Sequence, residues 1–344
     1  MSMWNKVWGS ERFPANGLWR CGMWGSERSL TAIAIRRALF SSGELGAAYV
    51  VRPIVSGNQA LFQDLASVSP VTSDGDPNGL MIDQSPNSIN ASQSTSAARP
   101  TYNANPDRLS LDKVDDALII TVPAGGWTGT MVLATDQGTA SYGVSIPAGS
   151  YGLGGQYFPG NAIVGALFRN GAMTSGEKAD TESYFVGNGA TASYGAVTNF
   201  SFYWQYRIEI TEFPIIDVSN GNNFTAAWQG RNDNSEKLVS FPLLDFSSGS
   251  NFLAAWQGQK VLTNFPQNSF DNVAGGNFNS AFNNTNLTQA SIDGILVSLV
   301  ASGIATGTRG FTQSGGSAPS VGTGQPAIDT LRSRGWTVGV TGGY

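Results

Sequence analysis

The chain has 344 residues, enough for two or three small domains, but only 12% of them are charged, about half the usual share. The net charge of −5 argues against a protein that neutralises nucleic-acid phosphates. Histidine is absent and Cys21 is the single cysteine, which excludes Ser-His-Asp catalysis, Cys-His catalysis and an intrachain disulfide.

The same composition limits the other classes of protein. There is no run of 18 apolar residues, so we expect no membrane insertion, and the N-terminus lacks the apolar core of a secretory signal. Glycine is abundant, with 43 residues, and favours strands and turns over long charged helices. Carboxylate-pair hydrolysis needs only Asp and Glu and stays open.

Residues 1–42 are predicted to form a docking arm. The segment contains six basic and two acidic residues, which gives it a net charge of +4. The pentapeptide Trp-Gly-Ser-Glu-Arg occurs at 8–12 and again at 24–28. A short helix is expected over 30–40. Tryptophan and arginine are enriched at protein interfaces, which favours docking on another protein. The alternative is an arm packed back on its own chain. The residues expected to dock are Trp4, Trp8, Trp19, Trp24, Arg12 and Arg28.

Residues 43–190 are predicted to form a β-rich domain. Turn signals lie at 73–77 and 124–126, and a helix capped by Thr174, with Glu177 in its first turn, is expected to end near Phe185. Three segments have the composition of strands: Ala47–Val55, Leu118–Val122 and Thr130–Ala134.

Three blocks of this domain resemble, in the same order, the LamG-like, concanavalin-type jelly roll found in phage and bacterial surface proteins. They are Gly-Leu-Met-Ile-Asp at 79–83, Ala-Arg-Pro-Thr-Tyr at 98–102 and Leu-Asp-Lys-Val-Asp-Asp-Ala-Leu at 111–118. Fewer residues follow than the remaining strands of that family need. The resemblance therefore implies a truncated or rebuilt sandwich, and no ligand site is transferred from it.

An internal repeat occupies the next region, 191–285. Four blocks align without gaps: Asn199–Gln205, Asn223–Gln229, Asn251–Gln257 and Asn277–Asn283. Phe-Pro pairs lie between them. Within a block, Phe, Ala and Trp fall at i, i+3 and i+4, which predicts one helical turn capped by Asn, with its aromatic face buried only when units stack. The pattern resembles the irregular leucine-rich repeats of BspA-type bacterial surface proteins, which also occur in phage tail proteins, with Phe replacing most leucines.

Residues 286–344 are predicted to cap the stack. One helix should begin after Thr288 and end at Gly303, and a second should span Ala327–Arg334 with Pro326 at its first position. A last strand is expected over Trp336–Val340. This ending resembles that of repeat proteins in marine phages. The predicted fold is therefore mainly β with short helices: an N-terminal arm (1–42), a jelly-roll-like β-sandwich (43–190), an irregular leucine-rich-repeat-like solenoid (191–285) and a helical cap (286–344).

Several residue groups invite a chemical interpretation. Asp115 and Asp116 could be catalytic or bind a metal, and an acidic trio could bind calcium, although such carboxylates more often close turns. That trio is Asp74, Asp76 and Asp83. The repeat tryptophans could stack on sugars, although their fixed place in the repeat favours a core role. These are Trp204, Trp228 and Trp256.

A polar insertion over 229–237 lengthens one unit, and loops on a rigid scaffold often carry recognition. The alternative is an ordinary solvated loop. The residues predicted to contact a receptor, there and in the next unit, are Arg231, Asn232, Asp233, Asn234, Lys237, Gln259 and Lys260.

The resemblances imply a structural protein of a bacteriophage virion, assembled in the host cytoplasm: a fibre or adhesion component of the tail. The arm would bind other virion proteins, and the repeats would display a surface for a host-cell glycan or protein. A homo-oligomer is expected, with a trimer favoured. No enzyme activity, cofactor, metal, nucleic acid or membrane insertion is expected. The alternatives are a non-adhesive structural or decoration protein of capsid or tail, and a carboxylate-dependent glycan depolymerase.

Overall fold

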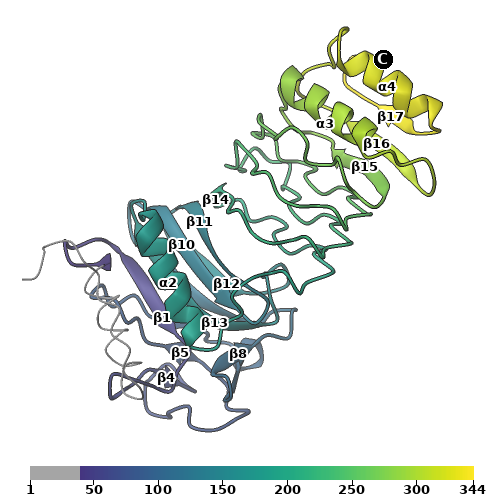
Figure 1. The fold of residues 1–344 in the computed structure, drawn as a ribbon. Helices are drawn as coiled ribbons and strands as arrows, with labels where there is room; N and C mark the ends of the chain where they lie inside the picture. The colour runs from purple at the N-terminus through teal and green to yellow at the C-terminus, as the bar shows by residue number, and fades with distance from the viewer. Residues whose placement is uncertain (1–38) are drawn as a thin grey trace, which may run out of the picture.

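The computed structural model describes residues 39–344 and is mainly β, with several sheets and three α-helices in that part of the chain (Figure 1). A β-rich body and a stack of coils follow one another, and the stack ends in two helices at the C-terminus. The predicted docking residues and most of the expected helix over 30–40 lie outside the described residues.

The larger sheet has seven antiparallel strands in the order β14-β11-β10-β13-β8-β7, with β1 also paired to β13. At its centre Met131 lies opposite Tyr142 on one side and Phe168 on the other, and all three side chains are buried. The strands are β1 (Gly46–Val50), β7 (Thr101–Asn103), β8 (Arg108–Ser110), β10 (Trp127–Thr135), β11 (Thr139–Ile146), β13 (Ala162–Asn170) and β14 (Ile210–Glu212).

A smaller antiparallel sheet of five strands lies in the order β12-β9-β6-β5-β4. Its inward residues Leu118, Ile120 and Leu153 belong to the same hydrophobic core as Met131 and Phe168 of the larger sheet. Two sheets thus share one core, as the alternating pattern of β9 requires. The strands are β4 (Leu61–Phe62), β5 (Leu80–Met81), β6 (Ala91–Ser92), β9 (Ala117–Val122) and β12 (Gly149–Gly154); β2 (Ile54–Val55) and β3 (Asn58–Gln59) form a separate hairpin, and Ser96–Ala98 is a 3₁₀ turn.

Helix α2 (Ser175–Gly187) lies across the larger sheet, on the side away from the shared core (Figure 1). Its start is as predicted: Thr174 accepts a hydrogen bond from the Glu177 amide, and the Glu177 carboxylate accepts one from the Thr174 amide. Leu39 and Phe40 are buried in the same cluster as the helix. The last described residues of the expected arm therefore pack with the body.

The repeat blocks form parallel coils that hydrogen-bond to one another. Amides of one block donate to carbonyls of the next, as Trp204 does to Ala227 (2.8 Å) and Trp228 does to Ala255 (2.8 Å). The predicted helical turn is wrong. The fourth residue of each block has a positive φ instead, between 51° and 63°, and a tight turn replaces the helix. The bonds to the next coil satisfy the amides that a helical turn would have used internally. The four residues are Phe202, Ala226, Ala254 and Ser280.

The last block is a strand, β15 (Gly276–Phe282), rather than the expected turn of helix. It pairs in parallel with β16 (Arg309–Gln313), which pairs in parallel with β17 (Thr337–Gly339). Helices α3 (Gln289–Ala301) and α4 (Gly324–Ser333) connect these strands. The Thr288 cap is confirmed, whereas Pro326 is the third residue of α4 rather than its first.

The coils continue directly from the two-sheet body, and one strand of the first coil pairs with the larger sheet. β14, which belongs to the first repeat unit, adds to the edge of β11, and Ser145 donates to the Glu209 carbonyl (2.8 Å). Beside it Arg207 forms a largely buried ion pair with Glu209, and both side chains hydrogen-bond to the Tyr151 hydroxyl. Within residues 39–344 no helix is long and apolar enough to cross a membrane.

Candidate recognition surfaces

The repeat tryptophans form a buried column. Trp228 lies between Trp204 and Trp256, with ring centroids 5.4 and 5.1 Å away and planes within 7° of parallel. Phe282 extends the column 5.0 Å beyond Trp256. The three tryptophans are at most 2% exposed. Their predicted core role is confirmed, and they offer no face to a sugar.

Two ladders of side-chain amides flank this column. The Asn251 side chain donates to Asn223 (3.1 Å) and accepts from Asn277 (2.7 Å). The asparagines of the first three blocks also accept from the backbone amide two residues on, as Asn251 does from Leu253 (3.2 Å). A glutamine ladder closes the other end of the block: Gln205 donates to Gln229, and Gln229 to Gln257. These ladders fix the coil register, because each rung needs its neighbour.

The insertion loop presents four of the seven predicted receptor contacts. Arg231, Asn232, Asp233 and Asn234 are exposed, and Arg231 and Asp233 form a loose ion pair (3.8 Å). The loop is anchored from below by the buried Glu236, whose carboxylate accepts from the Asn232 amide (2.9 Å). These side chains stay available for a partner.

The other predicted contacts are held by the protein itself. Lys237 donates to the carbonyl and hydroxyl of Ser145 in the larger sheet. Gln259 is 7% exposed and donates to the Trp228 carbonyl (2.7 Å). Gln259 is corrected, because it is buried and connects two coils. Lys237 is half-buried and connects the loop to the larger sheet, and its receptor contact stays a prediction. Lys260 is half-buried.

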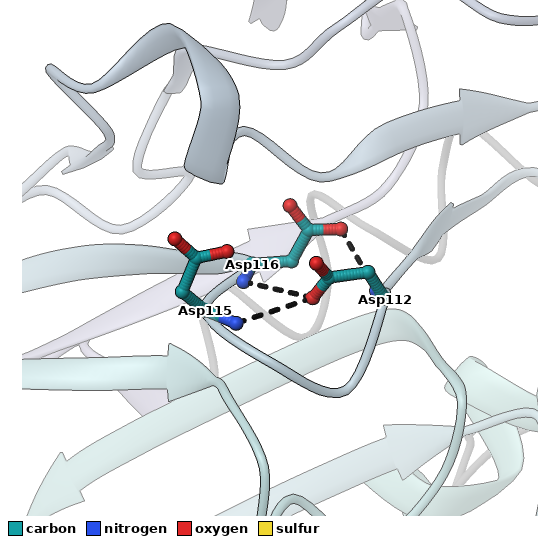
Figure 2. A group of neighbouring side chains, drawn as sticks. All are labelled: Asp112, Asp115 and Asp116. Carbon is teal, nitrogen blue, oxygen red and sulfur yellow. Dashed lines mark hydrogen bonds between the residues drawn. The ribbon is translucent and has the colours of Figure 1, made fainter.

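Asp112, Asp115 and Asp116 place carboxylate oxygens within 4.8 Å of one another (Figure 2). One Asp112 oxygen accepts from the amides of Val114, Asp115 and Asp116, and Asp116 accepts from the Asp112 amide (2.8 Å). These backbone bonds hold the Asp112 pKa below its usual value, while burial raises the pKa of Asp116. The carboxylates stabilise a turn ahead of β9, and nothing further points to a ligand.

The three acids considered for calcium do not form a group of neighbouring carboxylates: Asp74 and Asp76 belong to one turn, and Asp83 follows β5. Asp76 accepts from the amides of Thr72 and Ser73, which lowers its pKa. Asp83 is 7% exposed and accepts from the amides of Ala48, Ser85 and Ile89, and Asp74 accepts from the Ala104 amide (2.5 Å). Each therefore satisfies backbone donors, Asp76 within its own turn, and Asp74 and Asp83 in segments 30 and 35 residues away.

The sequence interpretation missed a cleft of about 440 Å³ where the first coil meets the sheets. Three aromatic residues, one lysine and several amide or hydroxyl side chains line it. They are Lys113, Gln156, Tyr157, Asn161, Ser201, Phe202, Tyr203 and Gln205. A signal was present in the repeat, because the first block has Phe202 and Tyr203 where the later blocks have Ala or Ser.

Comparisons with protein-family models, with curated proteins and with solved structures find no match for this chain. The resemblances to LamG-like and BspA-like proteins stay predictions.

Proposed function

We propose that this chain is a structural bacteriophage virion protein, a fibre or adhesion component of the tail that docks by its N-terminus and displays a host-recognition surface. In this proposal the two sheets form a rebuilt, jelly-roll-like sandwich, and the coils form an irregular leucine-rich-repeat-like solenoid. The non-adhesive capsid or tail protein is the second candidate, and it differs in lacking a host partner.

The stacked coils are the single observation that carries the proposal. An uninterrupted aromatic column, two amide ladders and a shared sheet make the coils a rigid continuation of the body. Along the side of that rod the loop at 231–234 extends exposed polar groups from a buried anchor. A rigid rod bearing an exposed loop suits display at a distance from an anchoring point.

The depolymerase alternative receives less support from the site geometry. The closest group of carboxylates among residues 39–344, at 112–116, is hydrogen-bonded to its own backbone. A glycosidase needs one carboxylic acid and one carboxylate facing a shared substrate across roughly 5–10 Å. We therefore propose a role without catalysis.

The proposal is tested by removing residues 1–38, which leaves the buried Leu39 and Phe40 in place. We expect the truncated protein to be soluble and to melt cooperatively, yet to be missing from purified particles in which the full chain is detected by immunogold electron microscopy. Incorporation of the truncated protein would contradict the docking role. Particles that never contain the full chain would contradict the virion proposal itself.

A further inference from the structure

We propose that the cleft between the first coil and the sheets binds a neutral pyranose unit of a saccharide. This site is separate from the loop at 231–234, and the inference stands whether or not the protein belongs to a virion.

The repeat supplies an internal control for Phe202 and Tyr203, which line the cleft, and for Tyr206, which packs against the lining residue Tyr157. Where the first unit has Phe202, the later units have Ala, Ala and Ser; where it has Tyr203, they have three alanines; where it has Tyr206, they have Gly, Gly and Asn. The coil therefore folds with small residues at all three positions. Three aromatic rings in this unit alone call for a reason other than coil formation.

Packing against the exposed end of the coil stack accounts for only one of the three aromatic side chains, Tyr203. Tyr203 packs edge-on against Phe200 (5.3 Å) and is half-buried against the core. Phe202 and Tyr206 remain 45% and 38% exposed. Their backbones have φ of 63° and 60°, a conformation that disfavours bulky side chains. Exposed aromatic rings at strained positions add little to stability, which points to a ligand.

The polar groups of the cleft are available for hydrogen bonding. The side-chain amides of Gln156 and Asn161 and the hydroxyls of Tyr157 and Tyr203 have no hydrogen-bond partner among residues 39–344. Gln205 is 6% exposed and begins the glutamine ladder, so its amide donates to the next rung while no described residue donates to its carbonyl oxygen. An unpartnered amide oxygen on a largely buried side chain at the wall of a cleft is a specific acceptor for a ligand hydroxyl.

Lys113 is the one charged residue that lines the cleft. Its ammonium group donates to the carbonyls of Phe158 and Gly160 (3.0 Å to Gly160), which leaves one donor free. Burial lowers the pKa of Lys113, and the nearby Asp136 carboxylate offsets only part of that effect. A phosphorylated ligand would need further cations, so the cleft suits an uncharged molecule.

A pyranose matches this combination of groups. Its C–H faces pack on aromatic rings, and its hydroxyls both donate and accept, as amides and phenols require. The edge-on pair of Tyr157 and Tyr206, 5.3 Å apart, holds one aromatic wall in place. The volume of about 440 Å³ falls in the range of small-ligand sites, roughly 300–1,000 Å³.

Saturation-transfer NMR and calorimetry with the full chain test the inference. The probes are glucose, galactose, mannose, N-acetylglucosamine, N-acetylgalactosamine and short oligosaccharides of each. Phe202→Ala and Tyr206→Gly install residues that the repeat itself uses at these positions, so both variants should fold. We expect at least one saccharide to bind the native chain and each variant to weaken that binding about tenfold or more. Ile215→Ala, at a side chain that is 81% exposed in the same unit, should bind normally.

Asn161→Ala provides a second route if either aromatic variant fails to melt cooperatively, because the Asn161 side chain is exposed. It too should weaken binding. The inference is overturned if no saccharide binds the native chain at about 10 mM, or if the folded cleft variants bind as the native chain does. It is also overturned if binding is lost in Arg231→Ala/Asp233→Ala and kept in the cleft variants, because the insertion loop would then be the site.

Discussion

Truncation of Trp228 to alanine tests whether the coils are held together by their aromatic column. The ring is 2% exposed and is stacked between Trp204 and Trp256. Phe213 and Phe241 meet it edge-on, at 5.6 and 5.0 Å. The substitution would leave a ring-sized cavity among rigid neighbours that cannot collapse into it.

The expected loss of unfolding free energy follows from this geometry. Replacing a buried Trp by Ala costs about 3–5 kcal/mol, and each ring pair adds about 0.5–1.5 kcal/mol to plain burial. The Trp228 indole N–H has no hydrogen-bond partner in the described structure, so the loss is one of packing alone. We expect a cost near the upper end, about 4–5 kcal/mol. Trp228→Phe, the residue found at the equivalent position 282, should cost less than half of that.

Urea denaturation followed by circular dichroism measures the change. With a slope of about 2–3 kcal/mol/M, the midpoint should fall by about 2 M in Trp228→Ala. Amide exchange should accelerate first around Trp204 and Trp256, because each coil is stabilised mainly by its neighbours. Ile215→Ala is the matched control and should change stability by less than about 0.5 kcal/mol. If Trp228→Ala lowers the unfolding free energy by less than about 1 kcal/mol, the aromatic column does not stabilise the coils and the reasoning is refuted.

Three further predictions concern the ladders, the loop and the cleft lysine. Asn251→Ala should lower the unfolding free energy by about 1–3 kcal/mol in urea denaturation, because it removes both of the ladder bonds that Asn251 makes. Asn199→Ala removes neither bond and should lower it less, and equal losses for the two variants would contradict this prediction. Arg231→Ala/Asp233→Ala should leave stability within about 0.5 kcal/mol and, under the adhesion proposal, weaken attachment to host cells; normal attachment would favour the non-adhesive alternative. Burial lowers the pKa of Lys113 from 10.5 to about 8, so the unfolded chain binds more protons between these values and this lysine should make stability rise from pH 8 to pH 10.5. Lys113→Met should lose that rise relative to the native chain, and parallel pH profiles of the two proteins would contradict it.

The repeat shows how far residue spacing alone could predict the structure. The recurrence of Phe, Ala and Trp identified the residues that stacked units bury, and Phe224, Ala227 and Trp228 are all buried. The same spacing suggested a helical turn, because three apolar residues at i, i+3 and i+4 share one helical face. In the structure a positive φ at Ala226 serves the same purpose. The choice depended on hydrogen bonds to the next coil, which local spacing does not encode.

The candidate surfaces show the same division. The sequence located the insertion loop and indicated that residues 231–234 would be exposed, because a polar insertion cannot be buried between stacked repeat units. It could not reveal that Lys237 reaches Ser145, 92 residues away, or that Gln259 bonds to the Trp228 carbonyl in the previous coil. Both contacts join segments that only the folded chain brings together.

The sequence by itself determined the β-rich class, the capped start of α2 and the core role of the repeat tryptophans, since each follows from local composition or from a pattern that every unit shares. The tertiary structure alone decided how the parts meet. β14 leaves the first repeat unit to join the larger sheet, and the buried Arg207–Glu209 pair secures that junction. The junction places Phe202 beside Lys113, two residues that are distant in the sequence, in one cleft. Their proximity depends on the packing of the first coil against the sheets, because sequence periodicity describes a unit and its copies but not the surface on which the first copy rests.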